Sequence, residues 1–335
     1  MTARERFRRT LNFERPDRLP LIEWAMWWDK TVDRWLSEGL EIPAEAPYTQ
    51  CDQIKRALGL DLDMQFWMDP IPETAPKPKR HGAPLVGSLS EYEALKPLLY
   101  PSAPFDRERL QAAAEAQKAG EAVLWATVVG PFWGPRALLG IENHLYAFYD
   151  EPELMDRINQ DLTDYNLRAM DELCRYAVPD FMTVAEDMSY NHGPMLSGQL
   201  FERFLAPFYR RMLPEWKARG IRVFCDSDGD VTELIPWLKA SGFEGILPLE
   251  RQAGVDVAAL REAHPDFLFL GHLDKTVMRH GEAAMRQEFE RLLPVMKSGG
   301  FLASVDHQTP PDVSLDTYRT YLRLYREYAE KGANP

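Results

Sequence analysis

The chain places an unusual density of carboxylates directly after a short apolar run. The stretch VFCDSDGDV, residues 223–231, begins with apolar residues and then presents Asp226, Asp228 and Asp230. A loop needs polar residues, but it does not need this density of acids. Other apolar runs also end in ionisable residues, namely Glu23, Asp69, Glu186 with Asp187, Glu250, His272 with Asp274, and Asp306 with His307, while Arg136 follows the run at 122–130.

Crowded carboxylates repel one another, at a cost on the order of several kcal/mol unless something offsets it. A metal ion, raised pKa values or a cationic substrate can each provide the offset, and the residues leave all three open. Asp228 and His307 are the strongest functional candidates. Other residues have a structural explanation as well. Asp230 fits a helix cap, His272 fits a hydrogen-bonded core histidine equally well, and Cys225 points away from Asp226 in a regular strand.

Tryptophans are dense after the first apolar run, at positions 24, 27, 28 and 35. In most chains such a cluster belongs to the core. Because this one follows the end of a predicted strand, we expect part of it, with Trp24 and Trp27, to wall a pocket for a flat or methylated ligand.

Short apolar runs predict the strands that position these side chains, at 18–24, 63–69, 122–130, 180–187, 221–228, 245–250, 267–274 and 301–307. From the fourth run onward, amphipathic helical patterns alternate with strands, which predicts a parallel α/β sheet closed as a (β/α)8 TIM barrel. The carboxyl ends of barrel strands converge on one face, so the ionisable residues would line one pocket. A doubly wound open sheet is the alternative fold, although no G-x-G-x-x-G follows any run.

We expect a single domain, residues 1–335, with N-terminal helical and loop additions. The region from about 30 to 120 contains the proline-rich stretches ETAPKPKRHGAP and YPSAPFD, and is interpreted as an irregular insertion of loops and extra helices around the barrel.

Helix boundaries can also be predicted. Ser197 and Ser314 are expected to cap helices, and Gly242 to end one. Pro207 and Pro214 should divide or kink the helix that Ser197 begins.

The formal net charge of −13 disfavours nucleic acid and anionic membrane surfaces as partners. Three scattered cysteines without a C-x-x-C motif indicate a reducing compartment. The N-terminus lacks the apolar segment of a secretory signal, and no apolar run reaches the roughly 20 residues of a membrane span. A cytoplasmic protein is therefore expected.

Four segments resemble the uroporphyrinogen decarboxylase superfamily, which includes true decarboxylases and corrinoid- and coenzyme-M-type methyltransferases. They are RERFRRTLNFERPDRLPL, EDMSYNHGPMLSGQLFERFLAPFYRRML, DSDGDVTELIPWLKASGFEGILPLE and DHQTPPDVSLDTYRTYL. The resemblance extends from about residue 4 to 330, and it implies a (β/α)8 barrel. Homodimers are common in this superfamily, and nothing in the sequence contradicts one.

Departures from the superfamily pattern bear on the reaction. True decarboxylases carry an RQAGR-type motif after the first strand, where this chain reads EWAMWWDKTVDRW. The methyltransferase branch holds zinc through an H-x-C motif after strand 5 and a further cysteine after strand 8. The matching positions here are Asp226, Asp228 and His307, and both thiolates are absent. The resemblance thus implies, as a hypothesis, zinc, iron or manganese held by Asp226, Asp228 or Glu186 together with His307.

The preferred function is methyl transfer between a small methylated substrate and a corrinoid carried by a partner protein. His307 and Asp228 would act as metal ligands or as an acid/base pair, with Glu186 assisting. The substrate-binding candidates are Trp24, Trp27, Asp69, Arg136 and Tyr190. Two alternatives remain: a uroporphyrinogen decarboxylase in which Asp69 stabilises a protonated pyrrole, and a barrel that binds a ligand without chemistry.

Overall fold

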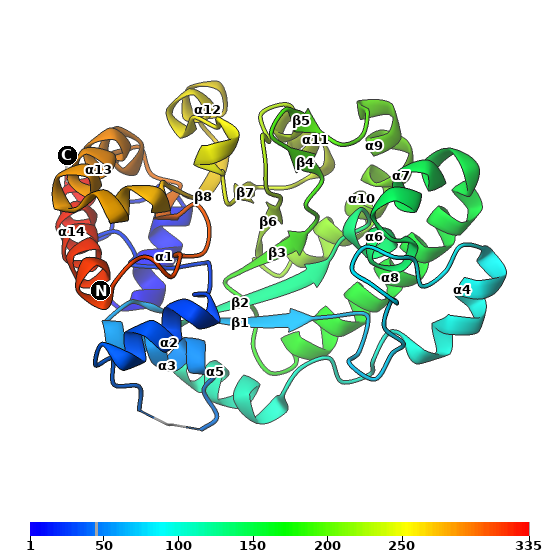
Figure 1. The fold of residues 1–335 in the computed structure, drawn as a ribbon, viewed down its shortest axis with the longest axis horizontal. Coiled ribbons are helices and arrows are strands. Elements are labelled where there is room, and N and C mark those ends of the chain that lie inside the picture. Colours follow the sequence, from blue (N-terminus) through cyan, green and yellow to red (C-terminus); the bar gives the residue numbers. More distant parts are fainter. Residues whose placement is uncertain (44–45, 335) are drawn as a thin grey trace.

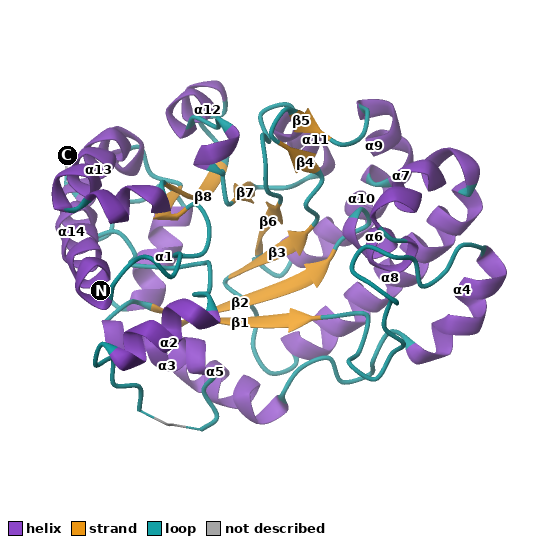
Figure 2. Ribbon diagram, viewed as in Figure 1, coloured by secondary structure: helices purple, strands orange, loops and turns teal. Residues whose placement is uncertain are grey.

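A parallel sheet forms the centre of the protein (Figures 1 and 2). The structure is a computed structural model, and it describes residues 1–43 and 46–334. Its seven strands follow one another in chain order without reversal. They are β1 (Leu62–Met68), β2 (Ala122–Val129), β3 (Phe181–Ala185), β6 (Arg222–Asp226), β7 (Gly245–Leu247), β8 (Leu268–Leu273) and β9 (Phe301–Val305). The doubly wound alternative is wrong, because that fold requires the strand order to reverse. The sheet is parallel and curled, as predicted. In the described residues it has seven strands with β1 and β9 at its edges, so the predicted closure into an eight-stranded barrel is not observed.

The predicted first strand, at 18–24, is not a strand. Backbone N–H groups of this segment donate to side chains instead of to a neighbouring strand. The Asp61 carboxylate accepts from the Leu21 N–H at 2.9 Å, and the Ser304 hydroxyl accepts from the Trp24 N–H at 3.4 Å. Asp61 directly precedes β1 and Ser304 lies in β9, so this irregular segment contacts both edge strands. Pro20, which has no N–H to donate, is one reason why it forms no regular ladder.

Helices surround the sheet (Figure 2). The α-helices are α1 (Ala3–Leu11), α2 (Asp29–Ser37), α3 (Gln50–Leu58), α4 (Leu89–Leu95), α5 (Arg107–Ala119), α6 (Trp133–Leu139), α7 (Ile141–Asp150), α8 (Pro152–Cys174), α9 (Gly198–Phe204), α10 (Ala206–Lys217), α11 (Leu234–Ser241), α12 (Val257–Ala263), α13 (Glu282–Lys297) and α14 (Leu315–Ala333). The 3-10 helices are η1 (Lys96–Leu98), η2 (Arg251–Ala253) and η3 (Lys275–His280), and β4 (Ser189–Tyr190) pairs with β5 (Gly193–Pro194) as a hairpin.

The predicted helix boundaries are confirmed. Ser197 and Ser314 accept the backbone N–H groups of Leu200 and Thr317. Gly242 ends α11 with a left-handed φ of 101°. The helix that Ser197 begins is divided at Leu205 into α9 and α10, just before Pro207, while Pro214 lies inside α10.

The region from about 30 to 120 holds β1 and several helices as well as loops. Within it, α2, α3 and α5 lie near β1, and α4 lies farther out beside α8 (Figure 1). In the described residues, no helix is long and apolar enough to cross a membrane.

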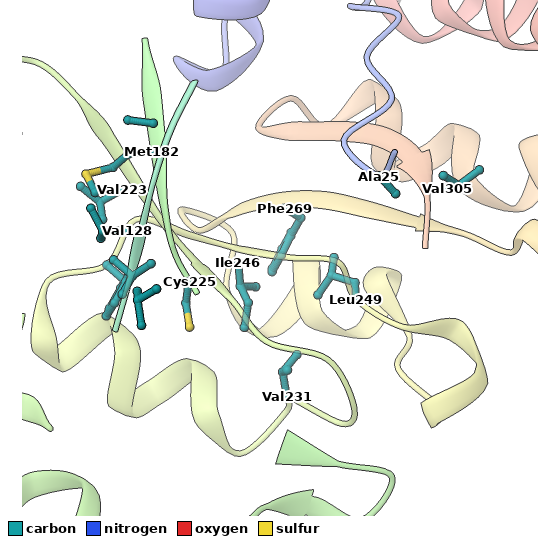
Figure 3. Close-up of a cluster of buried hydrophobic side chains, with 14 of the residues drawn as sticks. Ala25, Val128, Met182, Val223, Cys225, Val231, Ile246, Leu249, Phe269 and Val305 are labelled. Carbon is teal, nitrogen blue, oxygen red and sulfur yellow. The ribbon is translucent and has the colours of Figure 1, made fainter. Parts of the chain in front are cut away.

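Two buried layers lie on opposite faces of the sheet. The inner layer includes Val123 and Trp125 of β2, Phe181 of β3 and Phe224 of β6, and Phe7 and Leu11 of α1 pack against it. The outer layer lies between strands and helices, and Figure 3 shows part of it with Cys225, Val223 and Ile246. Apolar side chains thus fill the inner face around α1, which leaves the carboxyl ends of the strands for polar groups.

Candidate active site at the strand ends

Asp228 and His307, the two strongest candidates, lie together. The Nε2 atom of His307 is 3.9 Å from Oδ2 of Asp228. Asp228 follows β6 and His307 follows β9, so the curled sheet brings together residues that are far apart in the sequence. Their side chains are 38% and 33% exposed, which leaves both accessible to a small molecule.

The surroundings of this pair shift both pKa values. Burial, followed by the nearby charges of Asp187 and Glu250, raises the pKa of Asp228 to about 7. Burial, followed by the Lys275 ammonium, lowers the pKa of His307. Near neutral pH the imidazole is therefore uncharged, while the Asp228 carboxyl still holds its proton in about half of the molecules. A carboxyl with this pKa can act as a general acid at physiological pH.

Asp187 is a further site residue. Its place at a strand end can be predicted from the sequence, but its contact with the Asp228 loop cannot. Its Oδ1 accepts from the Asp228 N–H at 3.3 Å, and its carbonyl accepts from Nη1 of Arg136 at 3.2 Å. Its φ of 43° lies in the left-handed region, which costs a non-glycine residue about 1–2 kcal/mol. Burial raises the pKa of its carboxyl. The strained turn directs this acid toward the Asp228 loop.

The loop after β6 is fixed by close backbone contacts. Gly229 has a φ of 83°, and a Cβ at this position would lie 2.8 Å from backbone atoms of Tyr190. The Gly229 N–H donates to Oε2 of Glu250 at 3.1 Å, and the Asp230 N–H donates to the Tyr190 carbonyl at 2.9 Å. Glycine is therefore required here, and the hairpin β4–β5 and Glu250 hold Asp228 in place. Asp230 itself accepts from the Thr232 N–H in a local turn, as a structural role predicts.

Glu186 lies behind the site. Its carboxyl is buried and accepts from the N–H groups of Phe132 and Trp133, at 2.8 and 3.0 Å, and from the Tyr209 hydroxyl. Burial raises its pKa to about 8 despite these donors. With both oxygens engaged, Glu186 positions the loop after β2, and this arrangement gives no support to direct contact with a substrate.

Asp226 is half-buried, and burial, followed by the charges of Asp187 and Asp228, raises its pKa well above the usual range. Within residues 1–43 and 46–334, no group of three or more His, Cys, Asp or Glu side chains is arranged to hold a metal ion. Cys225 is buried among helix-facing apolar side chains, as its alternation with Asp226 predicts (Figure 3). In this part of the chain, no third donor is arranged with Asp228 and His307 to complete a zinc site, so the donor set does not fit zinc, and we derive no step through a metal.

Two other strand-end residues have structural roles. Glu23 is buried and accepts from the Ser304 and Tyr321 hydroxyls, at 2.8 and 2.5 Å, so it does not face a ligand. His272 is buried, with Nδ1 2.9 Å from the Leu249 carbonyl and Nε2 accepting from the Val257 N–H. It is a hydrogen-bonded core histidine.

Asp306 and Lys275 complete the charged surroundings. The Lys275 ammonium is 3.1 Å from Oδ1 of Asp306, and the Arg251 N–H donates to Oδ2. Asp306 is buried and directly precedes His307 in the sequence. The ion pair with Lys275 therefore holds the backbone that carries the His307 imidazole. The contact of Lys275 with Asp306 could not be predicted from the sequence, because the two residues lie 31 positions apart.

The substrate-binding candidates do not form one cluster; they lie at different positions near the carboxyl ends of the strands. Trp24 donates to the Val305 carbonyl at 2.6 Å, and its ring meets that of His307 edge-on with centroids 6.1 Å apart. Trp27 is buried against Trp35, although it also borders the cavity described below. Tyr190 is exposed beside the Gly229 loop.

Asp69 and Arg136 differ in their relation to the site. Asp69 is exposed after β1, where its carboxylate accepts from the Ile71 N–H and its carbonyl from the Tyr165 hydroxyl. Arg136 contacts the Asp187 carbonyl, and its guanidinium lies 5.0 Å from the Trp133 ring centroid. Arg136 is therefore linked to the Asp228 loop through Asp187.

Residues 57–328 match the uroporphyrinogen decarboxylase (URO-D) family. The chain belongs to this family. No curated protein matches this URO-D family chain.

Solved structures with a similar fold include a methyltransferase from Methanosarcina mazei, with a TM-score of 0.66, 15% identity and coverage of 98% of each chain. Identity this low supports a shared fold alone. A B12-independent methionine synthase from a Shewanella species, in complex with selenomethionine, has a TM-score of 0.46 and 12% identity over 69% of this chain and 67% of its own, which is too low to carry an argument.

Proposed function

We propose that this URO-D family protein is a methyltransferase that moves a methyl group between a small methylated substrate and a corrinoid carried by a partner protein. The observation that carries the proposal is the Asp228–His307 pair, 3.9 Å apart at the carboxyl ends of the strands. The similar fold of a protein named as a methyltransferase adds support of a general kind. We further propose a cytoplasmic location and a homodimeric state.

Within this pair, Asp228 is the proton donor. As the methyl–heteroatom bond breaks, the bonding electrons remain on the heteroatom, and the Asp228 proton moves to it. His307 is held uncharged by burial and by Lys275, so it can hydrogen-bond the Asp228 carboxyl, and in the reverse direction the Asp228 carboxylate takes the proton back. The corrinoid, when bound, would supply the methyl acceptor.

Exposed apolar side chains support the docking of a flat cofactor. Met26 and Trp67, which are 52% and 45% exposed, line a cavity together with Trp24, and Tyr190 is exposed next to Gly229. Macrocycle faces are apolar, and contact with such side chains would exclude water from the methyl group during transfer.

Decarboxylation of uroporphyrinogen has weaker support. The acids Asp187, Asp226, Asp228 and Glu250 surround the site, whereas an octa-carboxylate requires cationic partners. A binding titration with uroporphyrin tests this alternative directly, and micromolar affinity would favour it.

The proposal is tested by supplying reduced cobalamin as the acceptor together with methyl ethers, methyl thioethers and methylated ammonium compounds. Methylcobalamin formation is followed by its visible absorption. We expect turnover with at least one class, a loss of 100-fold or more in kcat for Asp228→Asn, since general acids contribute about 10²–10⁴-fold, and little change for the turn residue variant Asp230→Asn. Full activity of Asp228→Asn would overturn the assigned role.

Absence of turnover with every class, together with co-purification of a corrinoid protein, would favour the third alternative, a barrel that binds without chemistry. Consumption of uroporphyrinogen would instead favour the decarboxylase.

A further inference from the structure

A cavity of about 500 Å³ lies beside the candidate site, between β1, α3 and the segment that leads into α2. Three tryptophans line it: Trp24, Trp27 and Trp67. Trp67 is 45% exposed although it belongs to a strand, and Met26 is 52% exposed beside it. The cavity therefore has π-faces and polarisable sulfur available to a ligand.

Charged side chains of the cavity wall cancel one another in pairs. The Lys55 ammonium is 2.8 Å from Oδ1 of Asp63, and both are buried. The Arg109 guanidinium binds the Asp52 carboxylate at 2.9 Å, with both side chains at most 11% exposed. Neither cation is free to bind an anionic ligand, since its charge is already matched.

Asp29 is the exception among these wall residues. It is exposed at the start of α2, and within the described residues its carboxylate has no hydrogen-bond or ion-pair partner. With both neighbouring pairs neutral, the cavity wall of the described residues carries one negative charge without an ion-pair partner, next to three indole rings. This combination attracts a cation rather than an anion or a neutral molecule, because indole faces bind alkylammonium groups through their quadrupole.

We propose that this cavity binds a small organic cation of the methylated-ammonium class, with tryptophan rings around the methyl groups and Asp29 as the counter-charge. The inference rests on the proposed function insofar as it names the substrate of that site. Trp24 connects the cavity with the candidate active site. It lines the cavity, and the centroid of its ring lies 6.1 Å from that of the His307 ring. The Trp24 ring would then lie between the bound cation and His307.

Binding is measured by isothermal titration of the full chain without any corrinoid, using choline and, in parallel, its neutral isostere 3,3-dimethylbutan-1-ol. We expect saturable binding of choline and at least about tenfold weaker binding of the alcohol, which lacks only the charge. Equal affinity for the two probes, or no binding of choline, would overturn the inference.

Two variants test the assigned groups against matched controls. Asp29→Asn should weaken choline binding severalfold, and Asp33→Asn, an exposed acid on the same helix outside the cavity wall, should not. Trp67→Leu should weaken it likewise, and Trp28→Leu, an exposed ring that does not line the cavity, should not. Equal effects of variant and control in both pairs would contradict the assignment.

Failure here is distinguishable from failure of the proposed function. If choline does not bind but methyl ethers or thioethers are turned over with dependence on Asp228, the cation inference alone falls. If choline binds but no methyl transfer occurs, the binding site stands and the proposed reaction falls.

Discussion

Acidic side chains stand at both ends of the parallel sheet, but their surroundings differ. At the amino ends they are matched by arginines: Arg4 binds Asp180 at 2.7 Å, Arg18 binds Asp61 at 2.7 Å and Arg222 binds Glu244 at 2.5 Å. At the carboxyl ends, Asp187, Asp226 and Asp228 lie close together, and burial raises the pKa of each carboxyl, with the Asp187 charge raising the pKa values of Asp226 and Asp228 further. One end is arranged for stability, and the other retains unfavourable charge where barrel-type enzymes carry out chemistry.

The largest expected effect on stability lies at the amino end. Asp180 is 1% exposed, and besides Arg4 it accepts from Gln117 and from the Leu124 N–H. Asp180→Asn leaves the Arg4 charge without its partner, which should lower the free energy of unfolding by about 3 kcal/mol in urea denaturation. As a control, Asp17→Asn breaks the exposed pair with Arg6 and should change it by less than about 1 kcal/mol. Equal effects would erase the contrast between buried and exposed pairs.

The pH dependence of catalysis tests the carboxyl ends of the strands, where Asp228 lies. The pKa of Asp228 is raised to about 7, so its proton is present below that pH and lost above it. If that proton is donated during turnover, kcat should fall roughly tenfold per pH unit above about pH 7. A rate that rises through pH 7 would show that the ionised carboxylate is the active form.

A stability measurement should reveal the unfavourable charge directly. Asp228 is protonated in the folded state up to about pH 7 but only up to about pH 4 in the unfolded chain, so ionisation destabilises the fold as pH rises through this window. Asn cannot ionise. With allowance for solvent screening of a 38% exposed side chain, Asp228→Asn should stabilise the protein by roughly 1 kcal/mol at pH 8. The gain should vanish near pH 4, and destabilisation at pH 8 would contradict this assignment.

The smallest effect is expected from added metal ions. Asp228 and His307 alone make a weak site without thiolates, so zinc or manganese should raise the melting temperature by less than about 1 °C. A rise of several degrees that His307→Ala abolishes would restore the hypothesis of a metal held with Asp226. The acids at the carboxyl ends would then have a cationic partner after all.

Seven strands of the sheet could be predicted from their apolar runs, because a buried parallel strand needs a short continuous apolar segment and little else. The segment at 18–24 has the same composition but is not a strand, because its hydrogen bonds go to side chains such as Asp61 and Ser304. Nothing in the local pattern reveals such partners.

The same reason limits what could be predicted of the site. Asp228 and His307 could be paired from the sequence, since both follow strands of a parallel sheet. The burial of Glu23 could not be predicted, because the Glu23 carboxylate accepts a hydrogen bond from the Tyr321 hydroxyl, 298 residues away in the sequence. The role of Lys275 likewise depends on a tertiary contact with Asp306.

The most direct test of the central claim is the titration of the Asp228 carboxyl itself. Infrared difference spectra between the unaltered protein and Asp228→Asn, recorded from pH 4 to 9, isolate the carbonyl band of the protonated acid. We expect this band to be present at pH 6 and to disappear with a midpoint near pH 7. A midpoint near pH 4, the ordinary value for an exposed aspartate, would show that Asp228 is not held as an acid for catalysis.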